Sequence, residues 1–461
     1  MDLSRGLRWP LLLLHLALAT AFIPRAPHPY GRFGSSARKP FPKAAAPPAP
    51  VALRAAAAPC SPSEPCWPSA AQWAAFNASI DGALVAVVPL LAPCFGTFPG
   101  VPVNATVCAA IAGNFTNSFF RASTPGALQN MNWEQDRVTL DDCFEQAKPC
   151  RLGGLPPFAV AATSPEQVAA ALAFAAKHAL RPVVKSSGHE YQGRSTGLNG
   201  LLIWTHALRG AQFEPGFSAC PAAPRAPAVT TTPGTSWGEV YNLASANHVT
   251  VVGGSEISVS SCGGYTMGGG HSWMGPAFGM AADNARRFTL VLANGTLVSA
   301  SACENPDLFW ALRGGGGGTF GVVTSCTYAA HPYPTGGASG LFGTVGLLQG
   351  PPSLAILLDG FFAFTHTLSN VSESAGGVVA GGYVVPDFGA TPPHVSFLLG
   401  FNGTCVLAYA PHLRQVLTTP PPPLRAAWTK PTQRLLLLAR GCRRRPRTCP
   451  SSAPRCCPSL R

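Results

Sequence analysis

Two histidines stand in glycine-rich segments where they could do chemistry, His189 after Gly188 and His271 after Gly270. Glycines let the main chain approach a flat, anionic ligand closely and point its amides at phosphate groups. A histidine in such a segment can be a ligand, a base or a nucleophile toward an electrophilic cofactor. From spacing alone, the alternative is a loop histidine that is hydrogen-bonded to nearby main chain.

Other chemistries fit these histidines less well. Zinc needs further ligands at matched spacing, and two histidines without a third make a poor site, so we expect no metal. A Ser-His-Asp hydrolase needs a strained Gly-x-Ser-x-Gly turn, and we expect that this chain lacks one. A zinc site and a Ser-His-Asp hydrolase are therefore both disfavoured.

A third glycine segment matches the dinucleotide fingerprint in form, at Gly316, Gly318 and Gly321. That fingerprint needs a strand, then the glycines, then a helix whose start meets the pyrophosphate. Here a predicted helix precedes the glycines and a predicted strand follows them. We therefore interpret this segment as a tight connection between a helix and a strand.

The elements that must position these loops follow an alternating pattern of strands and helices. A helix is predicted from Ser164 to about His178, because Ser164, Pro165 and Gln167 supply a cap, a first-turn proline and a capping-box partner. Hydrophobic runs and an Asn-Gly turn predict the remaining elements. They are strands at 82–91, 158–162, 181–185, 201–204, 249–254 and 321–328, a hairpin at 288–299 and a short helix at 307–313. The glycine-dense segment 262–272 is expected to be a loop without regular structure.

Four motifs in this order resemble the vanillyl-alcohol-oxidase-type flavoproteins, whose FAD-binding domain is of the PCMH type. They are residues 185–196 (KSSGHEYQGRST), 263–272 (GGYTMGGGHS), 279–284 (GMAADN) and 307–325 (DLFWALRGGGGGTFGVVTS). The chain is most similar to the berberine-bridge-enzyme-like branch and its fungal isoamyl-alcohol-oxidase-like members. Residues 66–69 (CWPS) and 149–153 (PCRLG) also resemble the fungal branch, so the likeness covers about residues 60–335.

The resemblance implies an α+β fold, with an FAD-binding domain of two α/β subdomains and an antiparallel-sheet substrate domain that is incomplete here. His189 occupies the position that bonds the dimethylbenzene end of the flavin, and such a bond raises the flavin's potential. The other positions that match FAD-lining loops are Ser186, Ser187, Gly188, Gly263, Gly264, Gly268, Gly269, Gly270, Asp283 and Val322.

The chain departs from the family pattern at a second attachment point. Many members bond the flavin a second time through a cysteine six residues before the Gly-Gly of the second loop, where this chain has Ile257. We therefore expect a single covalent bond, through His189. Cys262 lies directly against Gly263 and is interpreted as a buried structural thiol.

Composition divides the chain into six segments. Residues 1–21 form a signal peptide pattern, and 22–59 form an acid-free Ala/Pro/Arg-rich segment that is a linker or a plastid transit-like leader. The apolar core of the leader is too short for a stable membrane anchor. A Cys-rich cap at 60–150, the FAD-binding domain at 151–335 and the start of a substrate domain at 336–412 follow. Residues 413–461 form a basic Pro/Arg/Cys tail, interpreted as disordered, whose composition resembles intron or shifted-frame translation, with a genuine basic tail as the alternative.

Charge and cysteines indicate the surroundings of the protein. The net charge is +13, but from His412 onward there are eleven Lys or Arg and no acid, which leaves +2 for the rest. We therefore expect no nucleic-acid binding.

Six cysteines before the FAD-binding domain favour disulfides of undetermined pairing, and Asn-x-Ser/Thr sites suit a secreted glycoprotein. The cysteines are at 60, 66, 94, 108, 143 and 150; the acceptors are Asn77, Asn104, Asn114, Asn294, Asn370 and Asn402.

The sequence therefore predicts an FAD-dependent oxidoreductase. Its substrate would be a small molecule, an alcohol or a sugar-like hemiacetal, that passes hydride to the flavin, with dioxygen or another acceptor taking the electrons. The alternative is a flavin-binding or truncated secreted glycoprotein without turnover. The sequence assigns no catalytic base, no oligomeric state and no choice between the extracellular space and a plastid.

Overall fold

The computed structural model describes residues 59–332, 338–346, 380–387 and 394–402. The predicted leader and tail, Asn370 and most of the expected substrate domain lie outside these residues. In the described part, no helix has both the length and the hydropathy needed to cross a membrane.

The first sheet has four strands in the order β1-β2-β4-β3. Strands β2, β3 and β4 run parallel, which requires a long connection between successive strands, and β1 is antiparallel to β2. The bounds are β1 Leu84–Ala86, β2 Phe158–Ala161, β3 Arg181–Lys185 and β4 Gly200–Trp204. Helix α5, Pro165–Lys177, connects β2 to β3.

Both faces of this sheet are covered, which explains the continuous hydrophobic run of β4. Leu201 and Ile203 face the cluster built by α5 and helix α1 (Ala70–Ser79), whose Trp73 and Phe76 are buried there. Leu202 faces the opposite cluster, with Val87, Leu155, Ala159 and Val183. The segment before residue 150 thus contributes both a strand and a helix to the core of the first sheet.

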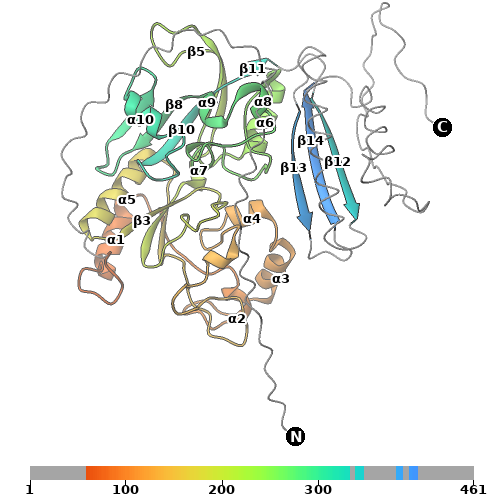
Figure 1. The fold of residues 1–461 in the computed structure, drawn as a ribbon. Helices are drawn as coiled ribbons and strands as arrows, with labels where there is room; N and C mark the ends of the chain where they lie inside the picture. Colours follow the sequence, from red (N-terminus) through yellow and green to blue (C-terminus); the bar gives the residue numbers. More distant parts are fainter. Residues whose placement is uncertain (1–58, 333–337, 347–379, 388–393, 403–461) are drawn as a thin grey trace, which may run out of the picture. The chain divides into compact units, whose positions relative to one another are not determined.

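The second sheet is antiparallel, with five strands in the order β5-β6-β10-β8-β9. Their bounds are β5 Ala211–Phe217, β6 Ala226–Thr231, β8 Ala285–Val291, β9 Leu297–Ser301 and β10 Val322–Ala329. Helices α6, Trp237–Ala246, and α10, Pro306–Ala311, pack on it through Trp237, Val240 and Phe309. Figure 1 shows α6 and α10 beside the strands of this sheet.

The remaining elements are short. Around the first sheet they are α2 Ala92–Phe95, α3 Ala105–Asn114, α4 Ser118–Ala122 and the 3-10 turns η1 Met131–Trp133 and η2 Thr205–Ala207. Around the second they are β7 Val249–Thr250, α7 Gly264–Met267, α8 Gly275–Phe278, α9 Ala281–Asn284 and β11 His331–Pro332, which pairs with β7. A separate antiparallel sheet contains β12 Ala338–Gly346, β14 His394–Asn402 and β13 Ala380–Asp387, in that order.

The predicted α+β fold is confirmed, with two sheets that each pack against helices. Helix α5 begins after Ser164, whose Oγ accepts the amide of Gln167 at 3.3 Å. The capping box is only half formed, because the side chain of Gln167 accepts from the amide of Thr163 instead. The hairpin of β8 and β9 turns at Asn294, as predicted.

Two predicted strands are shorter than expected, and one segment that was expected to lack regular structure contains a helical turn. The expected strand 82–91 is limited to β1, which ends before Pro89, a residue without an amide proton for a strand ladder. The expected strand 249–254 is limited to β7, because Gly253 packs against Trp237; a Cβ at Gly253 would lie 2.4 Å from its ring. The segment 262–272 contains one helical turn, α7.

Candidate functional site

The loop that carries His189 leaves the carboxyl end of β3 and returns to β4. Gly188 has φ +78°, a left-handed conformation that favours glycine. Residues of the Cys-rich segment hold the loop from one side. The amide of Gln129 donates to the carbonyl of Gly188 at 3.1 Å, Nδ2 of Asn130 to that of Glu190 at 3.2 Å, and Nε1 of Trp133 to that of Tyr191 at 2.9 Å.

A buried charge cluster lies beneath this loop. Lys185 is 1% exposed, and its ammonium donates to the carbonyls of Thr124, Pro125 and Ala127 at 2.6, 3.2 and 2.5 Å. Arg121 and Glu134 form a buried ion pair at 2.5 Å. Burial lowers the pKa of Lys185 to about 7, against the opposing attraction of Glu134. The cluster fixes residues 121–134, which in turn position the His189 loop.

His189 is half-buried, and one ring nitrogen is held by a hydroxyl. Nε2 of His189 lies 2.7 Å from Oγ of Ser258, and this hydroxyl donates to Oε1 of Glu256 at 2.7 Å. Burial lowers the pKa of His189, and the charge of Glu256 opposes that shift. The imidazole is thereby favoured in its neutral form, which has a lone pair to offer.

The second glycine loop meets the first through its starting glycines. Gly263 has φ +140°, and an added Cβ would lie 3.8 Å from Oγ of Ser186. An added Cβ at Gly264 would meet nothing within 4 Å. Oγ of Ser187 accepts the amide of Ser260 at 3.1 Å, which joins the two loops directly. The structure therefore brings Ser186, Ser187 and Gly188 together with Gly263 and Gly264, beside open space.

The other predicted cofactor residues have structural partners. The amides of Gly268 and Gly269 donate to the carbonyls of Gly264 and Thr266, both at 2.9 Å. Gly270 lies beneath the ring of Tyr265 and accepts the amide of Ala281. Asp283 is exposed and accepts the amide of Met280, and Val322 begins β10 with its side chain in the core. Only main-chain atoms of Val322 are thus available to a ligand.

The glycine run that was interpreted as a simple connection also reaches this site. Gly316 donates its amide to the carbonyl of Met267 at 2.8 Å, and a Cβ at Gly317 would lie 2.7 Å from Cα of Gly264. The run does connect α10 to β10, as predicted, but it also packs on the second glycine loop. Its length of five consecutive glycines was the sequence feature that could have indicated this contact.

The arrangement fits the FAD that the resemblance implies. The main-chain amides of Ser187, Gly188, His189, Gly263 and Gly264 find no acceptor among the residues the structure describes. Unpaired amides in glycine loops with positive φ form nests for anions such as a pyrophosphate. The same loops lack any side chain that would fill the open space at Gly264.

A cavity of about 430 Å³ borders this region. Ser187 and Ser258 line it, so it adjoins the residue that holds His189. Its other lining residues include the apolar Phe119 and Ile257 and the polar His206 and Arg209. This cavity offers room for part of a flat ligand or for a small substrate.

Contrary to expectation, residues 234–238 have the sequence Gly-x-Ser-x-Gly, and they line the same cavity. The serine in it, Ser236, has φ −84° and caps α6, where its Oγ accepts the amide of Glu239 and donates to the Glu239 carboxylate. A hydrolase nucleophile stands instead on a strained turn with a base at its hydroxyl. Ser236 is therefore a helix cap.

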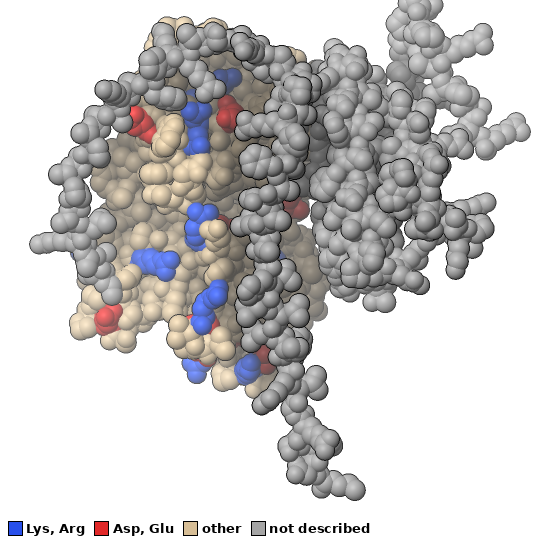
Figure 2. Space-filling view, viewed as in Figure 1, with Lys and Arg blue, Asp and Glu red and all other residues tan. Residues whose placement is uncertain are grey.

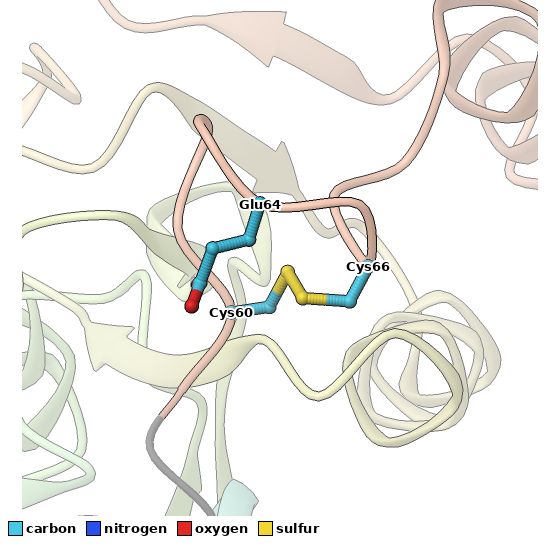
Figure 3. A group of neighbouring side chains, drawn as sticks. All are labelled: Cys60, Glu64 and Cys66. Carbon is cyan, nitrogen blue, oxygen red and sulfur yellow. A yellow bond between two sulfur atoms is a disulfide. The ribbon is translucent and has the colours of Figure 1, made fainter.

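Cys60, Glu64 and Cys66 form the group of potential metal ligands found in the described part (Figure 3). The two sulfurs are bonded to each other in a disulfide. The carboxylate of Glu64 accepts the amide of Ser61. Because disulfide sulfurs are not thiolates, these residues are not a zinc-type site.

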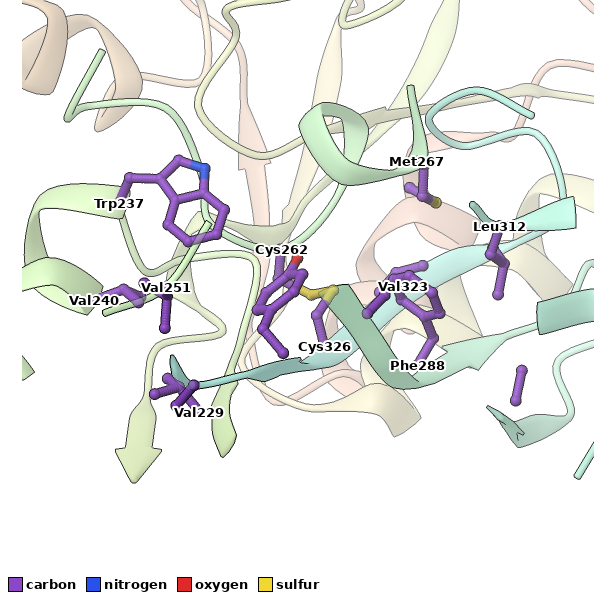
Figure 4. Packing of buried hydrophobic residues seen from close by; sticks show 14 of the residues in the cluster. Val229, Trp237, Val240, Val251, Cys262, Met267, Phe288, Leu312, Val323 and Cys326 are labelled. Carbon is purple, nitrogen blue, oxygen red and sulfur yellow. A yellow bond between two sulfur atoms is a disulfide. The ribbon is translucent and has the colours of Figure 1, made fainter. Parts of the chain in front are cut away.

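The six cysteines before the FAD-binding domain pair in sequence order, as Cys60–Cys66, Cys94–Cys108 and Cys143–Cys150. Two further disulfides are Cys220–Cys303 and Cys262–Cys326. Cys262 is buried, as expected, but the interpretation of it as a structural thiol was wrong, because its sulfur is bonded to Cys326. Figure 4 shows its disulfide in the core of the second sheet, between Trp237 and Met267, where it ties the residue before Gly263 to β10.

Charged side chains are sparse on the face of the described part that Figure 2 shows. Figure 2 shows isolated Lys and Arg side chains separated by uncharged surface on the visible face. Three of the five ion pairs in the described residues are between side chains at least 45% exposed, so they contribute little.

Comparison with known proteins agrees with this geometry. Residues 156–301 match the family model described as "FAD binding domain". The FAD-linked oxidoreductase patO of Aspergillus clavatus is 38% identical over 273 residues, which cover 59% of this chain and 46% of patO. The FAD-linked oxidoreductase easE of Epichloe festucae var. lolii is 40% identical over 282 residues, or 59% of this chain and 46% of easE. The chain spans about half the length of the curated relatives it matches.

The fold also matches a solved structure. The VAO-type flavoprotein MtVAO615 from Myceliophthora thermophila C1 superimposes with a TM-score of 0.66 at 30% identity, over 80% of this chain and 64% of that protein. Together with the glycine loops, these matches show that residues 156–301 are similar to an FAD-binding domain and that the fold is similar to that of a VAO-type flavoprotein.

Proposed function

We propose that this protein is an FAD-linked oxidoreductase that carries its flavin on a single covalent bond to His189. The observation that carries the proposal is the position of His189. It lies in a loop of unpaired amides that meets the second glycine loop through Ser186 and Ser187, and its ring, which burial favours in the neutral form, is held by Ser258. Position 257, where a second attachment would need a cysteine, is an isoleucine that lines the cavity.

The residues of this chain would bind and orient the cofactor. Amides of Ser187, Gly188, Gly263 and Gly264 would hold the pyrophosphate, and His189 would fix the dimethylbenzene end. Bound flavin supplies a two-electron acceptor for hydride from a C–H bond.

The proposed substrate is an alcohol or a sugar-like hemiacetal, with dioxygen as the electron acceptor. We place the chain in the berberine-bridge-enzyme-like branch, near the isoamyl-alcohol-oxidase-like members, on the motifs at 66–69 and 149–153.

The proposed location is the secretory pathway, ending outside the cell. Five disulfides in the described residues support it, because disulfides persist in oxidising compartments. Asn104 and Asn294 are exposed acceptors for glycosylation. A mass decrease on treatment with an N-glycosidase would support this route, and import of the leader into isolated plastids would support the plastid alternative.

The test is the absorption spectrum of acid-precipitated, washed protein. We expect flavin absorption in the pellet of the original chain and of His271→Ala, an exposed histidine of the second glycine loop. His189→Ala should release all flavin into the supernatant. Flavin in the His189→Ala pellet, or none in the original, would refute the covalent assignment. If the pellet retains flavin but no alcohol or sugar reduces the flavin of the native protein, the alternative of a flavin-binding glycoprotein without turnover is favoured.

A further inference from the structure

The hydroxyl of Ser258 connects His189 to a carboxylate. Oγ of Ser258 lies 2.7 Å from Nε2 of His189 and 2.7 Å from Oε1 of Glu256. The amide of Ser258 donates to the same Glu256 oxygen at 3.1 Å, which fixes the carboxylate in place. Ser258 is 3% exposed, whereas Glu256 is exposed, so the hydroxyl lies between a half-buried ring and the surface.

The direction of these hydrogen bonds is determined by the groups that make them. A carboxylate only accepts, and a serine hydroxyl has one proton to donate. The proton of Ser258 is therefore directed to Glu256, and its oxygen accepts from Nε2 of His189. The neutral ring then carries its proton on Nε2, and Nδ1 has the lone pair. In the described part of the chain, Nδ1 has no hydrogen-bond partner.

We infer that Ser258 and Glu256 are positioning residues that select this tautomer of His189 and make Nδ1 the atom that bonds the flavin. The inference rests on the proposed covalent attachment. Glu256 and Ser258 lie 67 and 69 positions after His189 in the sequence. Together they form a proton path from Nε2 of His189 to the surface.

The covalent step balances with this path. A bond forms between Nδ1 and the methyl carbon at the dimethylbenzene edge of the flavin, and one C–H bond of that methyl group breaks. The two electrons of that C–H bond reduce the ring system. The methyl proton and one proton from solvent supply the two protons of the reduced flavin, and the Nε2 proton that leaves the imidazole is released to solvent in exchange. Dioxygen then accepts two electrons and two protons, and leaves as hydrogen peroxide. Ser258 passes on the Nε2 proton as its own hydroxyl proton moves to Glu256.

The same three residues do not form a hydrolytic triad. In such a triad the serine donates to the histidine, and the carboxylate holds the other ring nitrogen. Here the carboxylate lies on the serine, so the hydroxyl is not activated by His189. The geometry instead lets Ser258 hold the proton of His189 on Nε2, which leaves Nδ1 as the nucleophilic atom of the ring.

The test compares covalent flavin content in variants of the full chain. Ser258→Ala removes the acceptor for Nε2–H, Ser258→Thr retains a hydroxyl, and Glu256→Ala removes the proton acceptor at an exposed position. We expect Ser258→Ala and Glu256→Ala to attach flavin roughly tenfold more slowly, or to a correspondingly smaller fraction, while Ser258→Thr stays near the original. The measurements are acid-stable flavin per protein and, separately, the flavin released on acid precipitation.

Two further measurements separate positioning from damage to the fold. The released flavin should rise in Ser258→Ala, which shows that the fold still binds FAD without the bond. Proton NMR of the histidyl-flavin peptide from the original chain should identify the Nδ1 linkage. If Ser258→Ala does not fold, Glu256→Ala alone decides, because its side chain is exposed.

The outcomes distinguish this inference from the proposed function. Equal covalent flavin in the original, Ser258→Ala and Glu256→Ala would overturn the inference and leave the attachment to His189 intact, as would a bond to Nε2. Absence of covalent flavin in the original chain would overturn both. Slower attachment in the two alanine variants, with recovery in Ser258→Thr, supports the inference.

Discussion

The ammonium of Lys185 lies 2.5 Å from the carbonyl oxygen of Ala127 and joins the end of β3 to the segment that holds the His189 loop. Gln129, two residues after Ala127, donates to the carbonyl of Gly188. A single buried side chain thus connects the sheet, the Cys-rich segment and the predicted cofactor loop.

This burial makes the stability of the protein depend on pH. The pKa of Lys185 falls from 10.5 to about 7 on folding, so the unfolded chain binds more protons than the folded protein between these values. The free energy of unfolding therefore rises with pH across that window, by at most about 1.4 kcal/mol per pH unit. Thermal unfolding of the original chain and of Lys185→Met at pH 7, 8 and 9 measures it.

We expect the pH slope to disappear in Lys185→Met, because methionine does not titrate. Lys185→Gln, which keeps a donor for the carbonyls, serves as a second non-titrating variant. Identical slopes in the original and both variants would show that another group is responsible.

Removal of one partner of the buried Arg121–Glu134 pair should destabilise the fold strongly. Their side chains are 3% and 6% exposed, so Arg121→Met leaves an unpaired carboxylate in the interior. Such a change costs about 3–5 kcal/mol. Denaturant unfolding of Arg121→Met measures the loss.

Adding Glu134→Gln to Arg121→Met should recover part of that loss, since no buried carboxylate then remains. Burial already raises the pKa of Glu134, so its charged form depends on Arg121. A double variant no more stable than Arg121→Met would show that packing of the arginine, and not charge pairing, dominates.

Much of the fold could be predicted because its signals are local. The cap at Ser164 and the hydrophobic run of β4 specify the first sheet within a few residues. Gly188 before His189 identified a loop of unusual backbone, and its φ of +78° agrees. The cofactor-lining residues themselves stay predictions, now with a described geometry.

The rest depends on contacts between distant residues, which spacing does not encode. Ser258 meets His189 across 69 positions, and the pairing of Cys262 with Cys326 spans 64. Lys185 was predicted only as the last residue of a strand, and the fold reveals its burial under three carbonyls. The glycine run at 314–318 was correctly placed between a helix and a strand, but its contact with Gly264 is tertiary.

The disulfide Cys262–Cys326 should contribute more stability than Cys60–Cys66. In the chain-entropy account, a closed loop of 64 residues is worth about 4 kcal/mol and one of 6 residues about 2 kcal/mol. Thermal unfolding of the double variants Cys262→Ala with Cys326→Ala, and Cys60→Ala with Cys66→Ala, compares them. A larger loss from the second pair would contradict this ranking.

Substitution of Gly264 should separate flavin binding from folding. An added methyl group meets no atom within 4 Å, and Gly264 begins α7 without a left-handed φ. Gly264→Ala should therefore fold with unchanged or slightly higher stability, by up to about 1 kcal/mol. The methyl group would occupy the open space between the two glycine loops, where the proposed pyrophosphate lies, so flavin content should fall strongly.

The matched control is Gly113→Ala in α3, which also meets nothing within 4 Å and lies in a helix of the Cys-rich segment. It should keep its flavin and gain similar stability. Flavin per protein and the unfolding temperature are measured for both variants. Full flavin content in Gly264→Ala would place the cofactor elsewhere, whereas loss of both flavin and stability would mean that the space at Gly264 is filled by protein.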